Sequence, residues 1–113
     1  MKWYPNLYLG TSLQGQGKYF IRKRLRMKLK RSYVITFPSN PTNLMDIIST
    51  AELCKKNYPK SDLYIMGIAG DYEEAVELAG CILSETYYQT GTFHLKKYLE
   101  SKTGRKVDSE WES

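Results

Sequence analysis

The most constraining feature of this chain is an apolar strand pattern that runs directly into a capped helix pattern. Residues 63–69 are apolar throughout, which is typical of a central strand covered on both faces. Gly70 turns the chain, and Asp71 is placed to cap the following helix, with Glu74 three residues later to complete a capping box. A strand and a helix joined this closely predict that the helix packs on the sheet to which the strand belongs.

Apolar residues of this helix recur at spacings of three and four residues, which is the period of a helix with one buried face. Gly91 is placed to end the helix, so we expect it over about residues 71–89. Acidic side chains in the first turn suit the positive end of the helix dipole. The inward-facing stripe is expected to comprise Ala75, Leu78, Ala79, Ile82, Leu83 and Tyr87.

Two further strands are predicted upstream of this unit. Residues 33–37 are rich in β-branched and aromatic side chains, and six turn-forming residues follow them at 38–43. Residues 44–48 predict a second strand that forms a hairpin with the first. A short helix over 44–48 is the alternative.

Two short helices complete the C-terminal half. One is expected at 51–57, capped by Ser49 or Thr50. The other follows Thr92, which can cap it, and ends at Gly104. The packing residues of this last helix are expected to be Phe93, Leu95, Tyr98 and Leu99.

Glycine and basic residues interrupt the patterns of the N-terminal third. Leu7–Leu9 predicts a short extended piece that ends at Gly10. Residues 13–28 have the spacing of a helix, whose start the neighbouring glycines shift toward Lys18. Residues 25–29 alternate apolar and basic side chains, which is the period of a strand. We therefore expect the helix to end between residues 27 and 31.

The length of 113 residues suits one domain with a single core. Ten tyrosines favour a core with much of its area near the surface, because a tyrosine covers apolar area while its hydroxyl stays wet. A recognition surface is the alternative explanation for this number. We expect an α+β fold: a small, mostly antiparallel sheet of three or four strands, with the helix at 71–89 on one face and a basic N-terminal helix. The domain is expected over residues 1–104, and residues 105–113 are expected to be a frayed tail.

Charge is divided unequally along the chain. The first 45 residues contain nine Lys or Arg and no Asp or Glu, whereas the remaining 68 contain eight basic and twelve acidic residues. Folding alone does not require this division, so it indicates an anionic partner for the N-terminal part. The candidate binding residues are Lys18, Arg22, Lys23, Arg24, Arg26, Lys28, Lys30 and Arg31.

Two kinds of partner fit this basic segment, which we define as residues 18–31. No acid within it lies three or four residues from a cation, and four of its eight cations are arginine, which grips phosphate in a fork. RNA or DNA is the first hypothesis. The alternative is an acidic surface: the acidic second half of the chain itself, another protein, or a second copy. The acidic face of a second copy would include Glu73, Glu77 and Glu85. A membrane surface is not expected as the partner, because the apolar side chains of this basic helix are needed for the core.

Catalysis is not indicated by the sequence. The single histidine, His94, has no partner at a spacing that places a base beside a nucleophile. A meeting in space of Cys54 with His94 is conceivable in any small protein and carries little weight. Ligand spacings of known metal sites are absent from the sequence. We expect no enzyme, no cofactor and no metal.

Gly67–Gly70 lies between a strand and a helix N-terminus, where backbone amides can bind phosphate. Three carboxylates follow at once, on Asp71, Glu73 and Glu74. A helix end offers about half a positive charge, which three full negative charges outweigh. We therefore interpret this segment as a tight strand-to-helix turn.

The cysteines and the apolar segments bear on the compartment. Cys54 and Cys81 lie in predicted helices and in no CxxC pair, which favours buried, reduced thiols in an intracellular protein. No apolar run approaches the length of a membrane span, and the start at Lys2–Pro5 is no signal peptide. The expected location is the cytoplasm.

The predicted order helix–strand–strand–strand–helix, over about residues 13–90, resembles that of the double-stranded-RNA-binding domain. That family contacts phosphates with a basic cluster that opens its last helix. Here the same position holds Asp71, Glu73, Glu74 and Glu77, and the positive charge lies on the first helix instead. The resemblance therefore extends to the element order alone, and any binding face would differ.

The chain also resembles small bacterial proteins of clostridial type and unknown function. The shared features are the aromatic start, the basic helix, the strand at 33–36 and the Ser39–Pro41 loop. Segments like 44–48 and 63–69 follow, and then a helix like Tyr72–Tyr88 with Thr90-Gly91. This resemblance implies a self-contained single domain without a cofactor, and it implies no particular activity.

Overall fold

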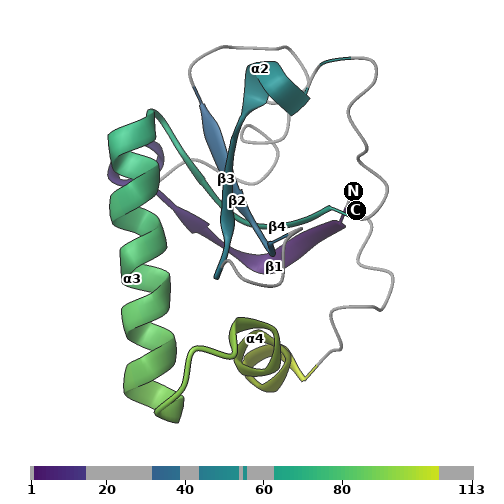
Figure 1. Ribbon diagram of the computed structural model, residues 1–113, viewed down its shortest axis with the longest axis vertical. Coiled ribbons are helices and arrows are strands. Elements are labelled where there is room, and N and C mark those ends of the chain that lie inside the picture. The colour runs from purple at the N-terminus through teal and green to yellow at the C-terminus, as the bar shows by residue number, and fades with distance from the viewer. Residues whose placement is uncertain (1, 15–31, 39–43, 54, 56–62, 105–113) are drawn as a thin grey trace.

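The computed structural model describes residues 2–14, 32–38, 44–53, 55 and 63–104 (Figure 1). These residues form a four-stranded sheet with helices around it. The elements are β1 (Lys2–Leu9), the 3-10 helix η1 (Thr11–Leu13), β2 (Tyr33–Thr36), β3 (Asp46–Ser49), α2 (Thr50–Leu53), β4 (Tyr64–Ala69), α3 (Tyr72–Thr90) and α4 (Leu95–Thr103).

The strand order in the sheet is β1-β4-β2-β3. β2 is antiparallel to both β3 and β4, whereas β1 is parallel to β4. The class α+β is therefore confirmed, but the expectation of a mostly antiparallel sheet is wrong, because the sheet is mixed. The hairpin of β2 and β3 confirms the strand expected at 44–48, and the helical alternative for that segment is wrong.

Strand β1 is irregular in the middle, so its sequence lacks the alternating pattern of a regular strand. Trp3 pairs with Ile65 and Tyr8 pairs with Gly67, so four residues of β1 lie opposite one residue of β4. Pro5, which has no amide hydrogen, lies in this irregular stretch of an edge strand, where the lost hydrogen bond costs least.

Strand β4 is buried along its whole length, as its apolar sequence predicts. On one face it contributes Tyr64 and Met66 to a core cluster with Ile82 of α3 and Leu99 of α4. Its other face contributes Ile65 and Ile68 to a second cluster. That cluster also contains Leu13, Val34 and Leu53.

Helix α3 has the two ends that the sequence predicts. Asp71 Oδ1 accepts a hydrogen bond of 2.8 Å from the Glu74 amide, which is the N-terminal cap. Gly91 is in the left-handed conformation with φ of 77° and donates its amide hydrogen to the Tyr87 carbonyl. Gly104 ends α4 in the same manner, with φ of 71°.

The buried face of α3 differs from the expected stripe at one end. Ala75, Ala79 and Ile82 are buried, and Leu78 and Leu83 are partly buried against the core. Tyr87, however, is 54% exposed, so its inward placement is wrong. Thr86 takes the buried position, since its hydroxyl donates 2.8 Å to the Ile82 carbonyl and needs no further partner.

Other expectations differ from the structure or fall on residues that it does not describe. Among the described residues the chain begins with strand β1 and contains no basic N-terminal helix; residues 15–31, where that helix is expected, lie outside the described part. His94, without a side-chain cap, precedes α4 where Thr92 was expected, and Phe93 is exposed. Cys81 is exposed rather than buried, because it lies on the solvent side of α3. Cys54 and residues 105–113 are outside the described residues.

Removing methyl groups from the α3 contact should cost much more than removing them from its solvent face. Ile82 is fully buried, so we expect Ile82→Ala to lower the free energy of unfolding by about 2–5 kcal/mol. Val76 is 47% exposed, and Val76→Ala should cost less than about 1 kcal/mol. Urea unfolding followed by circular dichroism measures both. Equal losses in the two variants would contradict this packing.

Candidate functional site

All eight cations of the basic segment lie outside the described residues, but the residues that flank it are well anchored. Leu13 and Ser32 are buried, and the Ser32 carbonyl accepts a 2.9 Å hydrogen bond from the Thr50 amide. Gly10 donates to Ile68, and Tyr33 pairs with Ala69, the next residue of β4. The described residues on the two sides of the segment therefore lie near the same end of β4, its C-terminal end.

The N-terminal end of α3 lies at the same end of β4, and there Glu74 joins two loops. Its carboxylate accepts hydrogen bonds from the Gly70 amide at 2.9 Å, the Ser12 hydroxyl at 2.9 Å and the Ser12 amide at 3.3 Å. These contacts replace the return bond of a capping box. They connect the loop after β1 with the loop after β4.

Two glycines make this connection possible. A Cβ atom on Gly10 would overlap the Glu74 carboxylate, and one on Gly70 would overlap the Ser12 hydroxyl oxygen. The loops therefore approach each other only because both positions lack side chains.

The Glu74 contacts also bear on whether Gly67–Gly70 could bind a phosphate. Gly67 is buried within β4, where a Cβ would meet the Tyr8 carbonyl oxygen at 3.1 Å. The Gly70 amide already donates to a carboxylate of the chain itself. The interpretation as a strand-to-helix turn therefore agrees with the geometry, and an anion would have to displace Glu74.

A second cluster of polar side chains lies where β1, α3 and α4 meet, and we call it the Glu85 cluster: Tyr8, Glu85, Tyr98 and Lys102. Glu85 Oε2 accepts hydrogen bonds from the Tyr8 hydroxyl at 2.7 Å, the Tyr98 hydroxyl at 2.7 Å and Lys102 Nζ at 2.9 Å. Lys102 Nζ also donates a hydrogen bond of 3.2 Å to the Tyr8 hydroxyl and lies 5.3 Å from the centre of the Tyr8 ring.

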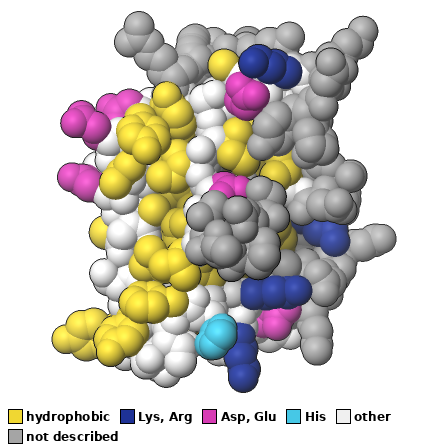
Figure 2. Space-filling view, viewed as in Figure 1, with side chains coloured by type: hydrophobic (Ala, Val, Ile, Leu, Met, Phe, Trp, Pro, Cys, Tyr) yellow, Lys and Arg dark blue, Asp and Glu magenta, His cyan; other side chains and the backbone are white. Residues whose placement is uncertain are grey.

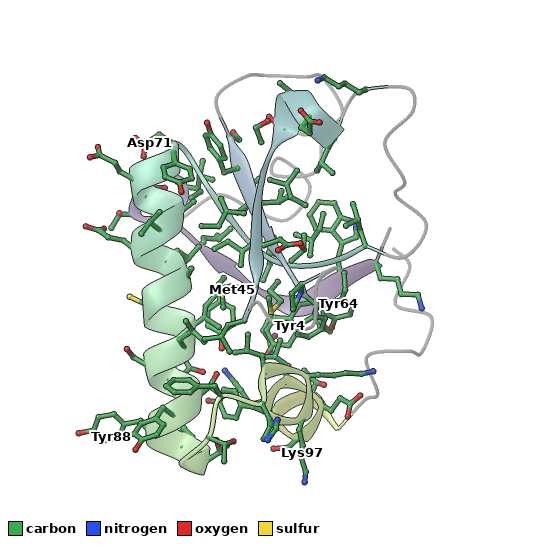
Figure 3. The ribbon with its side chains drawn as sticks, in the orientation of Figure 1. Tyr4, Met45, Tyr64, Asp71, Tyr88 and Lys97 are labelled. Carbon is green, nitrogen blue, oxygen red and sulfur yellow. The ribbon has the colours of Figure 1, made fainter. Side chains whose placement is uncertain are left out.

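Further tyrosines extend the Glu85 cluster into the core. Tyr4 and Tyr64 lie close together between the sheet and α4 (Figure 3). The Tyr4 ring stacks on Tyr8 with 5.7 Å between centroids, and Tyr64 stacks on Phe37 at 5.0 Å. The Tyr4 hydroxyl is buried without a hydrogen-bond partner among the described residues.

The electrostatics of the Glu85 cluster hold every member in its ordinary charge state. Burial opposes ionisation of Glu85, but hydrogen bonds from Tyr98, Lys102 and Tyr8 outweigh it and lower the pKa of that carboxyl. Burial and the bond to Glu85 raise the pKa values of Tyr8 and Tyr98. Burial disfavours the Lys102 ammonium, yet the bond to Glu85 raises its pKa overall. None of these four groups is poised to exchange a proton near neutral pH.

The Glu85 cluster changes one sequence-based hypothesis. Glu85 was counted in the acidic face that a basic partner would meet, but its carboxylate is already paired with Lys102 of the same chain. Glu73 and Glu77 remain exposed on α3. The sequence gives no local signal for this cluster, because Tyr8 and Glu85 are 77 residues apart. The only hint is the high number of tyrosines.

The other candidate chemistries find no geometric support in the described part of the chain. His94 is exposed, and Cys54, its conceivable partner, lies outside the described residues. Across residues 2–14, 32–38, 44–53, 55 and 63–104, no three His, Cys, Asp or Glu side chains gather as a metal site would require. Within the same ranges, none of the helices has the length and apolar character to span a membrane.

Comparisons with known proteins supply no relative. No family model matches the chain, and no match was found among curated proteins or solved structures. Function therefore has to be argued from charge and geometry.

Replacing the acceptor of the Glu85 cluster should loosen α4. We expect Glu85→Gln to lower the free energy of unfolding by about 1–2 kcal/mol, because the cluster is partly exposed and water replaces some of the lost attraction. Glu77→Gln, at an exposed position of the same helix, should change it by less than about 0.5 kcal/mol. Urea unfolding measures both. A Glu85→Gln protein as stable as Glu77→Gln would contradict the role of the cluster.

The raised tyrosine pKa values predict a loss of stability in alkali. A group whose pKa is higher in the folded state stabilises fully below its unfolded pKa, and the stabilisation is lost as pH rises toward the folded value. For Tyr8 and Tyr98 this window opens above about pH 10, and Lys102 acts in the same direction. The urea concentration at the unfolding midpoint should therefore decrease as the pH is raised from 9 to 11. The decrease should be smaller in Tyr8→Phe than in the control Tyr88→Phe, because Tyr88 is 90% exposed. A midpoint constant over this range would contradict the assignment.

Proposed function

We propose that this protein is a non-catalytic binding module that presents the basic segment, residues 18–31, to RNA or DNA. The observation that carries the proposal is the density of uncompensated charge. Eight cations fall within fourteen residues that contain no acid, and four of the eight are arginine. Phosphates spaced along a nucleic acid are the natural counterpart of such a segment.

The charge of the described residues supports the same partner. They contain five lysines and eight Asp or Glu residues, so the described body is negative on balance. The basic character of the whole chain, +5 at pH 7, therefore resides outside it. A polyanion that approaches this protein is attracted by the basic segment and not by the described part of the fold.

Competition from the chain's own carboxylates is reduced at the place where the segment is anchored. Glu74 accepts hydrogen bonds from Ser12 and Gly70, and Asp71 caps α3. Of the three acids that open α3, Glu73 alone has no such bond described. Asp71 and Glu74 therefore have fewer open acceptor positions for a lysine or arginine of the basic segment, although each keeps its negative charge.

The alternative function is a protein-interaction or self-associating module in which the basic segment meets an acidic face. Exposed Glu73 and Glu77 on α3 favour it, because that helix contains no Lys or Arg to neutralise them. Such binding would also weaken with salt, so salt dependence alone does not separate the two functions.

Mobility shifts with short RNA and DNA duplexes at two ionic strengths test the first function. We expect binding at low salt and a slope of about −0.9 in log affinity per log salt for each phosphate neutralised on duplex DNA. Changing Arg22, Arg24 and Arg26 together to Gln should weaken binding at least about tenfold and reduce the slope. Changing Lys55, Lys96 and Lys97 together to Gln removes the same charge from other surfaces and should have a smaller effect.

Two outcomes would contradict the proposal. The absence of any shift with either duplex at low salt would exclude nucleic acid as the partner. Equal weakening in the two triple variants would show that net charge, and not the basic segment, is responsible.

A further inference from the structure

Helix α3 exposes an apolar stripe beside its contact with the sheet; Tyr72, at one end of the stripe, also touches the Tyr33 ring of β2 edge-on. Tyr72, Val76 and Tyr87 are 55%, 47% and 54% exposed, and Leu83, between the last two, is partly buried. Phe93, 47% exposed, extends the stripe by stacking on Tyr87 with 5.1 Å between ring centroids. Figure 2 shows hydrophobic side chains along α3 on this face, from its upper end to the lower corner. A continuous, aromatic-rich stripe of this kind marks a binding surface.

The spacing of the stripe is the same in both directions. Its members on α3, Tyr72, Val76, Leu83 and Tyr87, are separated by four, seven and four residues. If a second copy of α3 lies antiparallel, centred between Ala79 and Gly80, Tyr72 faces Tyr87 and Val76 faces Leu83 on both sides of a two-fold axis. Gly80 leaves open space at this centre, since a Cβ there would meet nothing within 4 Å. A small residue at the crossing point lets two helices approach closely.

The charge on α3 also favours this orientation. Its N-terminal end carries Asp71 and the exposed Glu73 and Glu77, and the helix contains no Lys or Arg. An antiparallel pair keeps the two acidic ends apart and opposes the two helix dipoles. A parallel pair would place these like charges together.

We propose that the exposed stripe of α3 is a self-association surface, through which two copies of this chain form an antiparallel, two-fold symmetric dimer. A two-fold contact uses the same surface on both chains, which this palindromic stripe satisfies. The stripe on α3 runs from Tyr72 to Tyr87, which gives the contact a length of about 22 Å. The proposal is independent of nucleic-acid binding and of the basic segment.

Sedimentation equilibrium of the full chain over a range of concentrations tests the dimer. The decisive pair of variants is Tyr87→Glu and Tyr88→Glu, which place the same charge at neighbouring positions of one helix. Tyr87 is in the stripe, whereas Tyr88, 90% exposed, points away from it (Figure 3). We expect a dimer for the original chain and for Tyr88→Glu, and at least about a tenfold higher dissociation constant for Tyr87→Glu. Circular dichroism checks that both variants remain folded.

Three results would overturn the proposal. A monomer at every concentration would exclude the dimer. Equal weakening by Tyr87→Glu and Tyr88→Glu would place the contact elsewhere. Association that survives Tyr87→Glu but is lost when Arg22, Arg24 and Arg26 become Gln would assign it to the basic segment.

Discussion

Strand β4 is buried along its whole length and paired on both edges, parallel to β1 and antiparallel to β2. The other described elements pack on the faces of β4, pair with its edges or follow its C-terminal end. Its two faces hold the two apolar clusters, and its C-terminal end leads through Gly70 into the cap of α3. Because β1 runs parallel to it, the loops after both strands meet at one edge, where Glu74 joins them.

Two carboxylates of α3 thus stabilise the fold through hydrogen bonds within the chain. Glu74 satisfies amides and a hydroxyl at one end of the helix, and Glu85 binds Tyr8, Tyr98 and Lys102 near the other. The remaining acids of α3, Glu73 and Glu77, are exposed. The described fold provides an acidic, aromatic surface, while the positive charge of the chain is concentrated in residues 18–31.

Features decided by neighbours in sequence could be predicted. The cap at Asp71 and the stops at Gly91 and Gly104 each depend on the local chemistry of one or two residues, and all three are confirmed. Features decided by distant contacts could not be predicted. The parallel pairing of β1 depends on β4, more than fifty residues later, and its irregular stretch around Pro5 removes the alternation that marks a strand.

The candidate sites divide in the same way. Glu85 has the helical spacing of a solvent-facing acid, and only the approach of β1 and α4 makes it a partner of three donors. Tyr87 continues the apolar spacing of α3 but is exposed, and the neighbouring Thr86 is buried, with its hydroxyl bonded to the Ile82 carbonyl. The basic segment is visible in the sequence because charge density needs no tertiary contact to be recognised.

The central claim is that the cations of residues 18–31 meet an external polyanion rather than the carboxylates of their own chain. Nuclear magnetic resonance of the backbone amides and arginine side chains, recorded while a short RNA duplex is added, tests it most directly. We expect shifts concentrated in residues 18–31 and at the flanking Gln14 and Ser32, with α3 unchanged. Shifts that are absent from this segment, or a release of α3 carboxylates as the duplex binds, would contradict it.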